Sequence, residues 1–448
     1  MTAATTFARL KIQKGFVKLS SLLLLSLTAS LAFAQQAHQD ENSTQWSPVT
    51  LAGEFLEHDY VNWFAYADGV YDTYAPISTN GQTTNGGSFG WTLGGGVNVN
   101  HEFRDGQLSL SYRGDYRDYA SSSYSTGTDQ NLGVSYVKRL ARRWTLSTSL
   151  GAGISFYGGT FSSNSPNSTN ILVNNPFASE TKYLSAGASI SYQQSRRLSY
   201  VASGSYFLQR YNYPGSIGAE GVSGSGSVFY RATARTTVGA TYSHSYYTFQ
   251  RGVGTTNGDT IQASLSRIFP NHWTASVSAG VTFSRISGTS VLPAGLFFSN
   301  VGPGVYLVQH FNESTSFPSF SGTVGRGFRR SNFYATAGQG LSAGNGYYLA
   351  SKALYLNALY SIALTKRQNV GLSGGYNRLS SVSNTVSTQF SSSSLTAFYA
   401  VNLLRHFGLN ARYDYVHYGS LSPYPSVNDN RLSFGVNFSS RSVPLTLF

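Results

Sequence analysis

The chain has 448 residues, of which 11% are Asp, Glu, Lys or Arg, against roughly a quarter in typical soluble domains. The mean hydropathy of −0.17 excludes a membrane protein made of apolar helices. Cysteine is absent, which excludes a disulfide scaffold, thiolate metal sites and a cysteine nucleophile. With 15% aromatic residues and 47 glycines, the composition favours an all-β chain.

The N-terminus predicts an exported protein. Four basic residues and no acidic one accompany the apolar run "LSSLLLLSLTASLAFA", and Ala32 and Ala34 frame an Ala-x-Ala cleavage site. We therefore expect residues 1–34 to be a cleaved secretory signal peptide, whose removal lowers the net charge from +13 to +9 because it takes away those four basic residues. An uncleaved anchor helix is the alternative, which the short apolar core disfavours. Residues 35–59 are polar and aperiodic, so we expect a flexible periplasmic N-terminal segment.

From about residue 60 to residue 440, apolar and polar residues alternate with a period of two. In residues 144–155 the even positions are mostly apolar, and the odd positions hold Ser, Thr or Gly. The same pattern recurs in residues 273–284 and 432–438. It predicts β-strands with one apolar face and one face that is polar, small and uncharged.

The connections between these runs are of two alternating kinds. Eight are short and mostly basic, and about nine are longer and rich in Ser, Asn, Gly and Thr, such as residues 158–180 and the stretch from Gly288 to about Glu313. This count predicts about 16–18 strands. We expect the basic side chains of the short turns to contact lipid headgroups, with plain solubility as the alternative. The residues in question are Arg142, Arg143, Arg196, Arg197, Arg329, Arg330, Lys366 and Arg367.

The signal peptide, the meander of alternating strands and the asymmetry between short turns and long loops together resemble bacterial outer-membrane β-barrel proteins, the porin-like members in particular. The resemblance implies an all-β, transmembrane antiparallel up-and-down β-barrel over residues 60–440, located in the cell outer membrane and surrounded by its lipid. It also implies help from periplasmic chaperones and the barrel-assembly machinery. Pro444 disfavours a continued final strand, so residues 441–448 are expected to form a C-terminal tail.

Such barrels carry aromatic girdles where the membrane meets water. A soluble β-sandwich or propeller is the alternative, but its strands are about five or six residues long, whereas the runs here are about twice that. The residues expected in the girdles are Trp91, Trp144, Phe156, Trp273, Phe283 and Phe438.

Charged residues in the middle of strands indicate a lumen. An Arg or Lys that faces lipid at mid-depth costs roughly 2–4 kcal/mol, so these side chains should face inward or lie near a rim. One interpretation is a structural salt-bridge network inside the wall, and the other is a constriction that orients solutes. The candidate pore-lining residues are Glu102, Arg113, Asp115, Arg117, Asn410, Arg412 and Asp414.

No pattern in the sequence predicts an enzyme, a cofactor or a metal site. Two G-x-S-x-G motifs, at residues 86–90 and 371–375, lack the helix that a nucleophile elbow needs. The eight histidines form no H-x-H pair, and the basic residues form no stripe for nucleic acid. Barrels of 16–18 strands leave an aqueous lumen unless plugged, so we expect passive diffusion of small polar solutes. A structural or adhesive barrel without an open pore is the alternative; a barrel for hydrophobic solutes is disfavoured by the Ser- and Thr-rich face.

Overall fold

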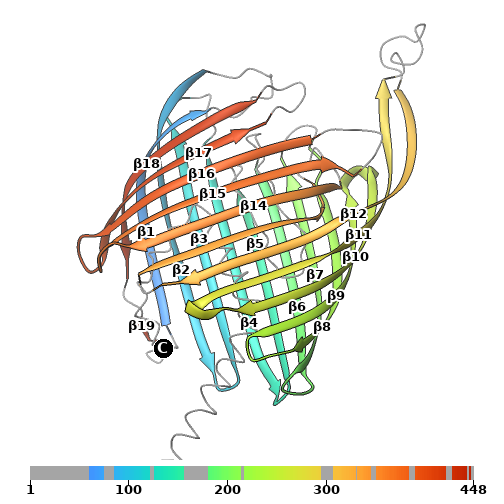
Figure 1. The fold of residues 1–448 in the computed structure, drawn as a ribbon. Coiled ribbons are helices and arrows are strands. Elements are labelled where there is room, and N and C mark those ends of the chain that lie inside the picture. Colours follow the sequence, from blue (N-terminus) through green and yellow to red (C-terminus); the bar gives the residue numbers. More distant parts are fainter. Residues whose placement is uncertain are drawn as a thin grey trace, which may run out of the picture.

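The computed structural model describes residues 60–74, 85–121, 126–155, 180–212, 216–293, 306–328, 330–344, 350–382, 389–419, 426–440 and 443–444. Over these ranges the chain forms one antiparallel sheet in which each strand pairs with its neighbours in sequence. The first strand also pairs with the eighteenth, which closes the sheet into a barrel (Figure 1). The prediction of an all-β, antiparallel up-and-down barrel of 16–18 strands is therefore confirmed. The barrel strands are β1 (Tyr60–Tyr74), β2 (Asn85–Phe103), β3 (Gly106–Tyr119), β4 (Gly127–Ala141), β5 (Trp144–Ser155), β6 (Thr181–Gln193), β7 (Leu198–Tyr211), β8 (Ala219–Arg231), β9 (Thr236–Phe249), β10 (Gly254–Ile268), β11 (Trp273–Pro293), β12 (Tyr306–Gly327), β13 (Ser331–Ser342), β14 (Ser351–Ala363), β15 (Gln368–Ser381), β16 (Gln389–Asn402), β17 (Phe407–Tyr418) and β18 (Val427–Ser439).

The closing strand pair is longer than the sequence predicts. After β18 ends, a two-residue strand, β19 (Val443–Pro444), pairs with Val61 and Tyr60 at the start of β1. Part of the segment expected to be a C-terminal tail thus extends the barrel. Pro444 is tolerated because it lies opposite Tyr60, at the very end of the ladder, where its missing N–H removes no bond from the interior of the sheet.

The two ends of the barrel differ in their connections. At one end the strands are joined by the short turns that the sequence predicts, for example residues 142–143 and 364–367. The opposite end carries the longer connections, with one exception: β9 and β10 are joined by a tight turn containing the 3₁₀ segment η1 (Gln250–Gly252). Among the described residues, no helix is long and apolar enough to cross a membrane.

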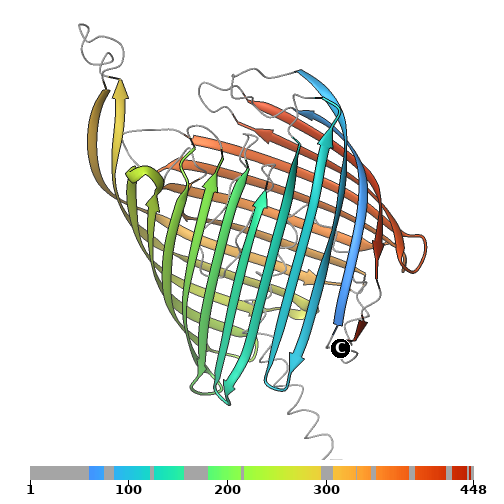
Figure 2. The same cartoon turned by 180° about the vertical axis from the view of Figure 1, so that it is seen from behind.

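The long loop expected from Gly288 to about Glu313 is instead largely strand. β11 continues to Pro293 and β12 begins at Tyr306, and the two pair from Gly288–Phe311 to Pro293–Tyr306. This ribbon projects beyond the neighbouring strands (Figure 1 and Figure 2). The prediction was wrong here because apolar residues follow one another at 291–292 and 306–308, which breaks the period of two. The loop expected at 158–180 lies outside the described residues except for its last position.

The period-two pattern fixes which face of each strand points outward. Directly paired residues lie on the same face of a sheet, and the pairs Val134–Leu150 and Leu150–Ala186 place the even residues of β5 on the outside. The outward apolar side chains are strongly exposed, for example Val277 at 56% and Phe434 at 60%. Exposure of large apolar side chains around the whole barrel is expected for a surface that contacts lipid. The barrel is about 35 Å wide between backbones, from eighteen strands about 4.8 Å apart and tilted by about 40°.

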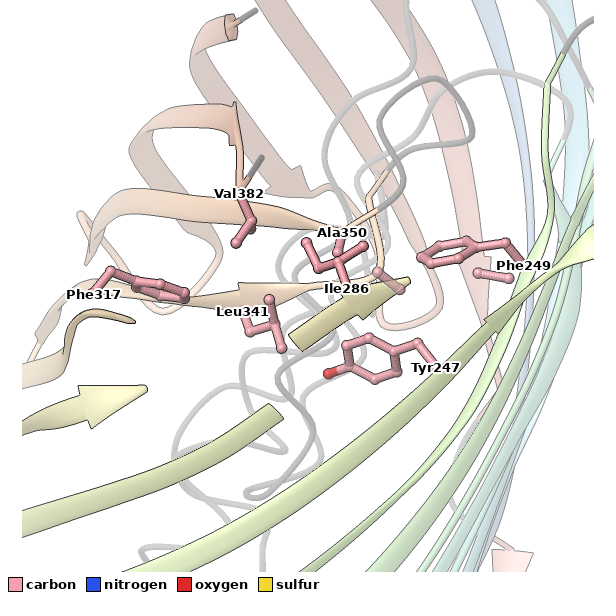
Figure 3. Packing of buried hydrophobic residues seen from close by; sticks show 9 residues of the cluster. Tyr247, Phe249, Ile286, Phe317, Leu341, Ala350 and Val382 are labelled. Atoms are coloured by element: carbon pink, nitrogen blue, oxygen red, sulfur yellow. The ribbon is translucent and has the colours of Figure 1, made fainter. Parts of the chain in front are cut away.

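Away from the short turns, β13 separates from β12, whereas β14 stays paired with β15 up to Ser351–Ser381. The ladder between β12 and β13 runs only from Gly327–Asn332 to Phe320–Gln339, although β12 extends to Tyr306. Beyond Gln339, the end of the β13–β14 hairpin packs on the inner faces of other strands (Figure 3). The resulting inner apolar cluster consists of Ala219, Tyr247, Phe249, Ile286, Phe317, Leu341, Ala343, Ala350 and Val382.

Candidate functional site

A wall of charged residues lines the inner face where the first strand, β1, meets the eighteenth, β18. The predicted groups on β3 and β17 are about 300 residues apart in sequence. Closure of β1 against β18 places them on one continuous surface, where the blue and red strands adjoin in Figure 1. This charged wall spans β16–β18 and β1–β4 and comprises Asp68, Asp72, Arg113, Asp115, Arg117, Asp129, Arg412, Asp414, Asp429 and Arg431.

Arg113 and Asp115 meet at a tyrosine from β1. The Tyr66 hydroxyl donates to Asp115 Oδ2 at 2.8 Å and accepts from Arg113 Nε at 3.1 Å and Nη2 at 2.5 Å. Arg113 Nη2 also lies 3.3 Å from Asp115 Oδ2. The Tyr66 ring lies against the backbone of β2 at Gly94, where an added Cβ would come within 2.3 Å of it. The glycine therefore makes room for the ring and orients its hydroxyl toward the charged pair.

A second group joins β18, β1 and β3. Arg431 Nε and Nη2 each lie 2.9 Å from Asp72 Oδ2, and the Tyr119 hydroxyl donates to the same oxygen at 3.0 Å. Asp72 is fully buried. Arg117, on the same face of β3, is also buried, and its Nε donates to Thr92 Oγ1 at 3.3 Å.

The third group lies on β16 and β17 and reaches back to β1. Arg412 and Asp414 form a forked ion pair, with Nη2 to Oδ1 at 2.6 Å and Nε to Oδ2 at 2.7 Å. The Thr396 hydroxyl donates to Asp414 Oδ1 at 2.6 Å. Across the seam, Asn410 Nδ2 donates to Asp68 Oδ1 at 3.0 Å.

Six of the seven candidate pore-lining residues thus lie together on the inner face. Glu102 lies on that face as well, but at the short-turn end of β2, opposite Gln107 and away from the three groups. Sequence reasoning missed Asp68, Asp72, Asp429 and Arg431, although the same criterion finds them. In β1, as in β3, the charged residues alternate with apolar or small ones inside a strand, and in β18 Asp429 and Arg431 lie on either side of Asn430.

Apart from the apolar cluster, the inner face from β5 to β12 is lined mainly by hydroxyl groups. These hydrogen-bond to one another between neighbouring strands at 2.6–2.9 Å and carry no charge. Because Ser and Thr are short, this hydroxyl wall takes up little of the space inside the barrel. The pairs are Ser147–Ser189, Ser203–Ser225, Ser205–Ser223, Ser227–Thr241, Thr260–Thr282, Ser276–Thr323 and Ser278–Ser321.

The outer face has the dimensions of a lipid-embedded band. On β7 the outward residues are apolar or small from Leu198 to Leu208, and the charged Arg210 follows, paired with Glu220 at 3.0 Å. Ten residues of strand tilted by about 40° rise about 25 Å, which matches the apolar band of outer-membrane barrels.

No protein-family model matches the chain, and no curated protein matches it. Among solved structures, the chain is similar to a BenF-like porin from Pseudomonas fluorescens Pf-5, at 11% identity and a TM-score of 0.41, over 86% of this chain and 99% of that one. It is also similar to OccK2 (OpdF) of Pseudomonas aeruginosa, at 9% identity and a TM-score of 0.41, over 86% and 98% of the two chains. The third is OpdK of Pseudomonas aeruginosa with vanillate, at 10% identity, a TM-score of 0.39, and 85% and 98% coverage.

The predicted girdle residues that the structure describes all lie on the outer face. Trp144, Trp273 and Phe438 lie at the short-turn end. Trp144 contacts Tyr192 with ring centres 4.6 Å apart, and Phe438 contacts Trp63 at 4.8 Å. Toward the opposite end, Trp91 and Phe283 are exposed on the outer face. Phe156 lies outside the described residues, as do Ala32 and Ala34 of the expected signal peptide.

The basic turn residues lie beside the girdle residues of the short-turn end. Six of them are exposed in their turns: Arg142, Arg143, Arg196, Arg197, Lys366 and Arg367. Arg330 is exposed just before β13, and Arg329 lies outside the described residues. A neighbouring side chain, Arg326, stacks on the rings of Trp273 and Phe328, with its guanidinium 5.2 and 3.9 Å from their centres.

Neither G-x-S-x-G motif forms a nucleophile elbow. Both G-x-S-x-G motifs, 86–90 and 371–375, lie within strands β2 and β15. Within the described ranges, no group of three or more His, Asp or Glu is placed to hold a metal ion. What the lumen does provide is an electrical asymmetry: ionisable side chains on the charged wall face neutral hydroxyls on the other side. Low-dielectric walls concentrate such a field.

Proposed function

We propose that this chain is an outer-membrane channel through which small polar solutes diffuse passively. The observation that carries the proposal is the combination of an apolar outer band with an inner face of hydroxyl and charged groups, in a closed barrel too wide for its wall side chains to fill. The proposal assigns the chain no catalytic activity and no cofactor. It places outer-membrane lipid around the band and relies on periplasmic chaperones and the barrel-assembly machinery for insertion.

We propose further that the charged wall governs which solutes pass. The ion pairs account for much of its charge as a structural network, but the wall also holds polar atoms that the network leaves unused. The buried Oδ1 atoms of Asp115 and Asn410 accept no hydrogen bond from the residues that the structure describes. Buried acceptors of this kind ordinarily find a partner, and a water or solute donor in the lumen can supply it.

Planar bilayers test the channel directly. Purified, folded protein should give steady conductance. Silent bilayers, from protein whose electrophoretic mobility still shifts on heating, would refute the proposal and favour the structural or adhesive alternative. That alternative draws on the complete burial of inner-face residues such as Thr256 and Thr282, which other parts of the chain cover.

Selectivity tests the role of the charged wall. Changing Arg113 and Arg117 to Ser removes two positive charges from the lumen and should shift the reversal potential in a salt gradient toward cation preference. Arg196→Ser with Arg197→Ser is the matched control, since it removes the same charge from an exposed turn. Equal shifts in both double variants would show that net charge, not the wall, sets selectivity.

A further inference from the structure

Two strands end in the same way on the outer face, at the short-turn end of the barrel. Arg267 and Arg326 are the last outward residues of β10 and β12, and a phenylalanine, Phe269 or Phe328, follows each of them two positions later. The backbone N–H of each phenylalanine closes its turn by donating to a carbonyl across it, at 2.8 and 2.7 Å. The turns therefore fix a ring directly beyond each arginine.

These rings position both guanidinium groups. Arg267 lies 5.2 Å from the ring centre of Phe269, and Arg326 lies 3.9 Å from that of Phe328 and 5.2 Å from that of Trp273. Among the described residues, the buried Nε of Arg326 has no hydrogen-bond partner, so ring contacts hold this group. A planar guanidinium that stacks on a ring can still direct its N–H edges to an oxyanion.

The two arginines lie on either side of β11. Arg267 is opposite Ala275, and Arg326 is opposite Trp273, the next outward position of the same strand. With strands about 4.8 Å apart and a rise of about 3.3 Å per residue, the two arginine Cα atoms are about 12 Å apart. Two long side chains can close this distance around one phosphate group. The arginine–aromatic patch consists of Arg267, Phe269, Trp273, Arg326, Phe328 and Phe333, whose ring meets that of Trp273 edge-on at 6.0 Å.

No carboxylate of the surrounding strands can neutralise the patch. From Thr236 to Ala363, which covers β9 to β14, the sequence holds two acidic residues, Asp259 and Glu313. Both lie in the strand halves away from the short turns. Asp259 is eight residues from Arg267, about 26 Å along the strand. An anion for these guanidinium groups therefore has to come from outside the chain.

We propose that the arginine–aromatic patch binds the headgroup of an anionic phospholipid. Short turns of outer-membrane barrels face the periplasm, so the patch lies at the level of the headgroups of the periplasmic leaflet. Its rings occupy the depth that aromatic residues favour at a membrane surface, and its charge complements the phosphate. Stacking distinguishes the patch from the exposed arginines of the turns, because a guanidinium held in place loses less freedom on binding. The inference does not depend on whether the lumen conducts.

Trp273 can report the lipid that contacts it. A variant in which Trp46, Trp63, Trp91 and Trp144 are changed to Phe keeps it as the single tryptophan. This protein is reconstituted in vesicles that contain brominated phosphatidylglycerol or brominated phosphatidylcholine, which quench tryptophan fluorescence on contact. Both lipids carry a phosphate, but only the first has a net charge. We expect Trp273 to be quenched more strongly by phosphatidylglycerol at equal content.

Substitutions within the patch separate charge from stacking. Arg326→Gln removes one charge and should lower the preference for phosphatidylglycerol by about fivefold, since a basic residue near a membrane surface contributes about that factor. Phe328→Leu keeps the charge, removes the ring, and should lower the preference by a smaller factor. Arg330→Gln is the matched control: Arg330 is exposed in the turn that follows β12, so its removal takes away the same charge and should leave the preference almost unchanged.

The comparison of the two lipids decides the proposal. Equal quenching by both lipids in the protein with an intact patch would overturn it, and this result needs no patch variant to fold. Equal losses of preference in Arg326→Gln and Arg330→Gln would also overturn it, because the net charge of the turns would then suffice. A preference that Arg326→Gln lowers, in vesicles that show no conductance, would support the lipid site and reject the channel.

Discussion

Removal of Arg431 should destabilise the closed barrel. Arg431, on β18, binds Asp72 on β1 across the pair of strands that closes the sheet. We expect Arg431→Met to keep most of the side-chain volume while leaving the carboxylate of Asp72 without its cation. Such a loss should weaken the seam more than the loss of any exposed arginine.

The structure gives the size of the effect. Asp72 is 0% exposed and takes contacts from two Arg431 nitrogens at 2.9 Å each, besides the hydrogen bond from Tyr119 at 3.0 Å. Removing one partner of a buried ion pair costs about 3–5 kcal/mol. Because the Tyr119 hydroxyl remains, we expect a value near 3 kcal/mol. Arg196→Met in an exposed turn should change stability by less than about 0.5 kcal/mol.

The free energy of unfolding can be measured by urea titration of the barrel in lipid vesicles, with tryptophan fluorescence as the signal. The strands carry four tryptophans, Trp63, Trp91, Trp144 and Trp273. The double variant Asp72→Asn with Arg431→Met should recover part of the loss, since position 72 then carries no unpaired charge. A loss below about 1 kcal/mol for Arg431→Met would refute the reasoning, because it would mean that lumen water solvates Asp72 as well as arginine does.

Two further substitutions test the faces of the sheet. Leu150→Arg puts a charge on the outer face of β5 and should cost about 2–4 kcal/mol of stability in vesicles, whereas Ser149→Arg, one residue away on the inner face, should cost far less. Gly435→Ala should shift reversal potential and lower stability, since its Cβ would overlap Asp68 Oδ1 at 1.8 Å; Gly226→Ala, whose Cβ would meet nothing within 4 Å, should do neither, and an equal effect of both would contradict the assigned role of Asp68.

Local patterns were sufficient to predict most of the barrel. The period of two in residues 144–155 depends only on which side of one strand meets lipid, so the strand count and the inward direction of Arg113 and Arg412 follow from short segments. The same applies to the short turns, because two strands joined by a few residues must pair with each other.

Features set by distant pairing could not be predicted in this way. No pattern near Arg431 in the sequence predicts its ion pair with Asp72, because that pair depends on the register in which β1 closes against β18. The separation of β13 from β12 occurs beside Pro318, which lies in a different hairpin, and Leu341 then packs over Gly258 of β10. In the β11–β12 ribbon apolar residues follow one another at 291–292 and 306–308, so the sequence shows no alternation and predicts a loop.

Part of the charged wall can form only after the hydroxyl wall, at the step in which the barrel closes. Hydroxyl pairs such as Ser203–Ser225 join neighbouring strands of one part of the chain, and Arg412–Asp414 lies within a single strand. Arg431–Asp72 and the Asn410–Asp68 hydrogen bond join β17 and β18 to β1, so they exist only after the sheet has closed. Before closure, β1 is an open edge of the sheet. Asp68 and Asp72 on its lumen side would then lack Asn410 and Arg431 as partners. Barrel closure and completion of the charged lumen are therefore one event, and the ion pairs of the seam contribute stability only to the closed form.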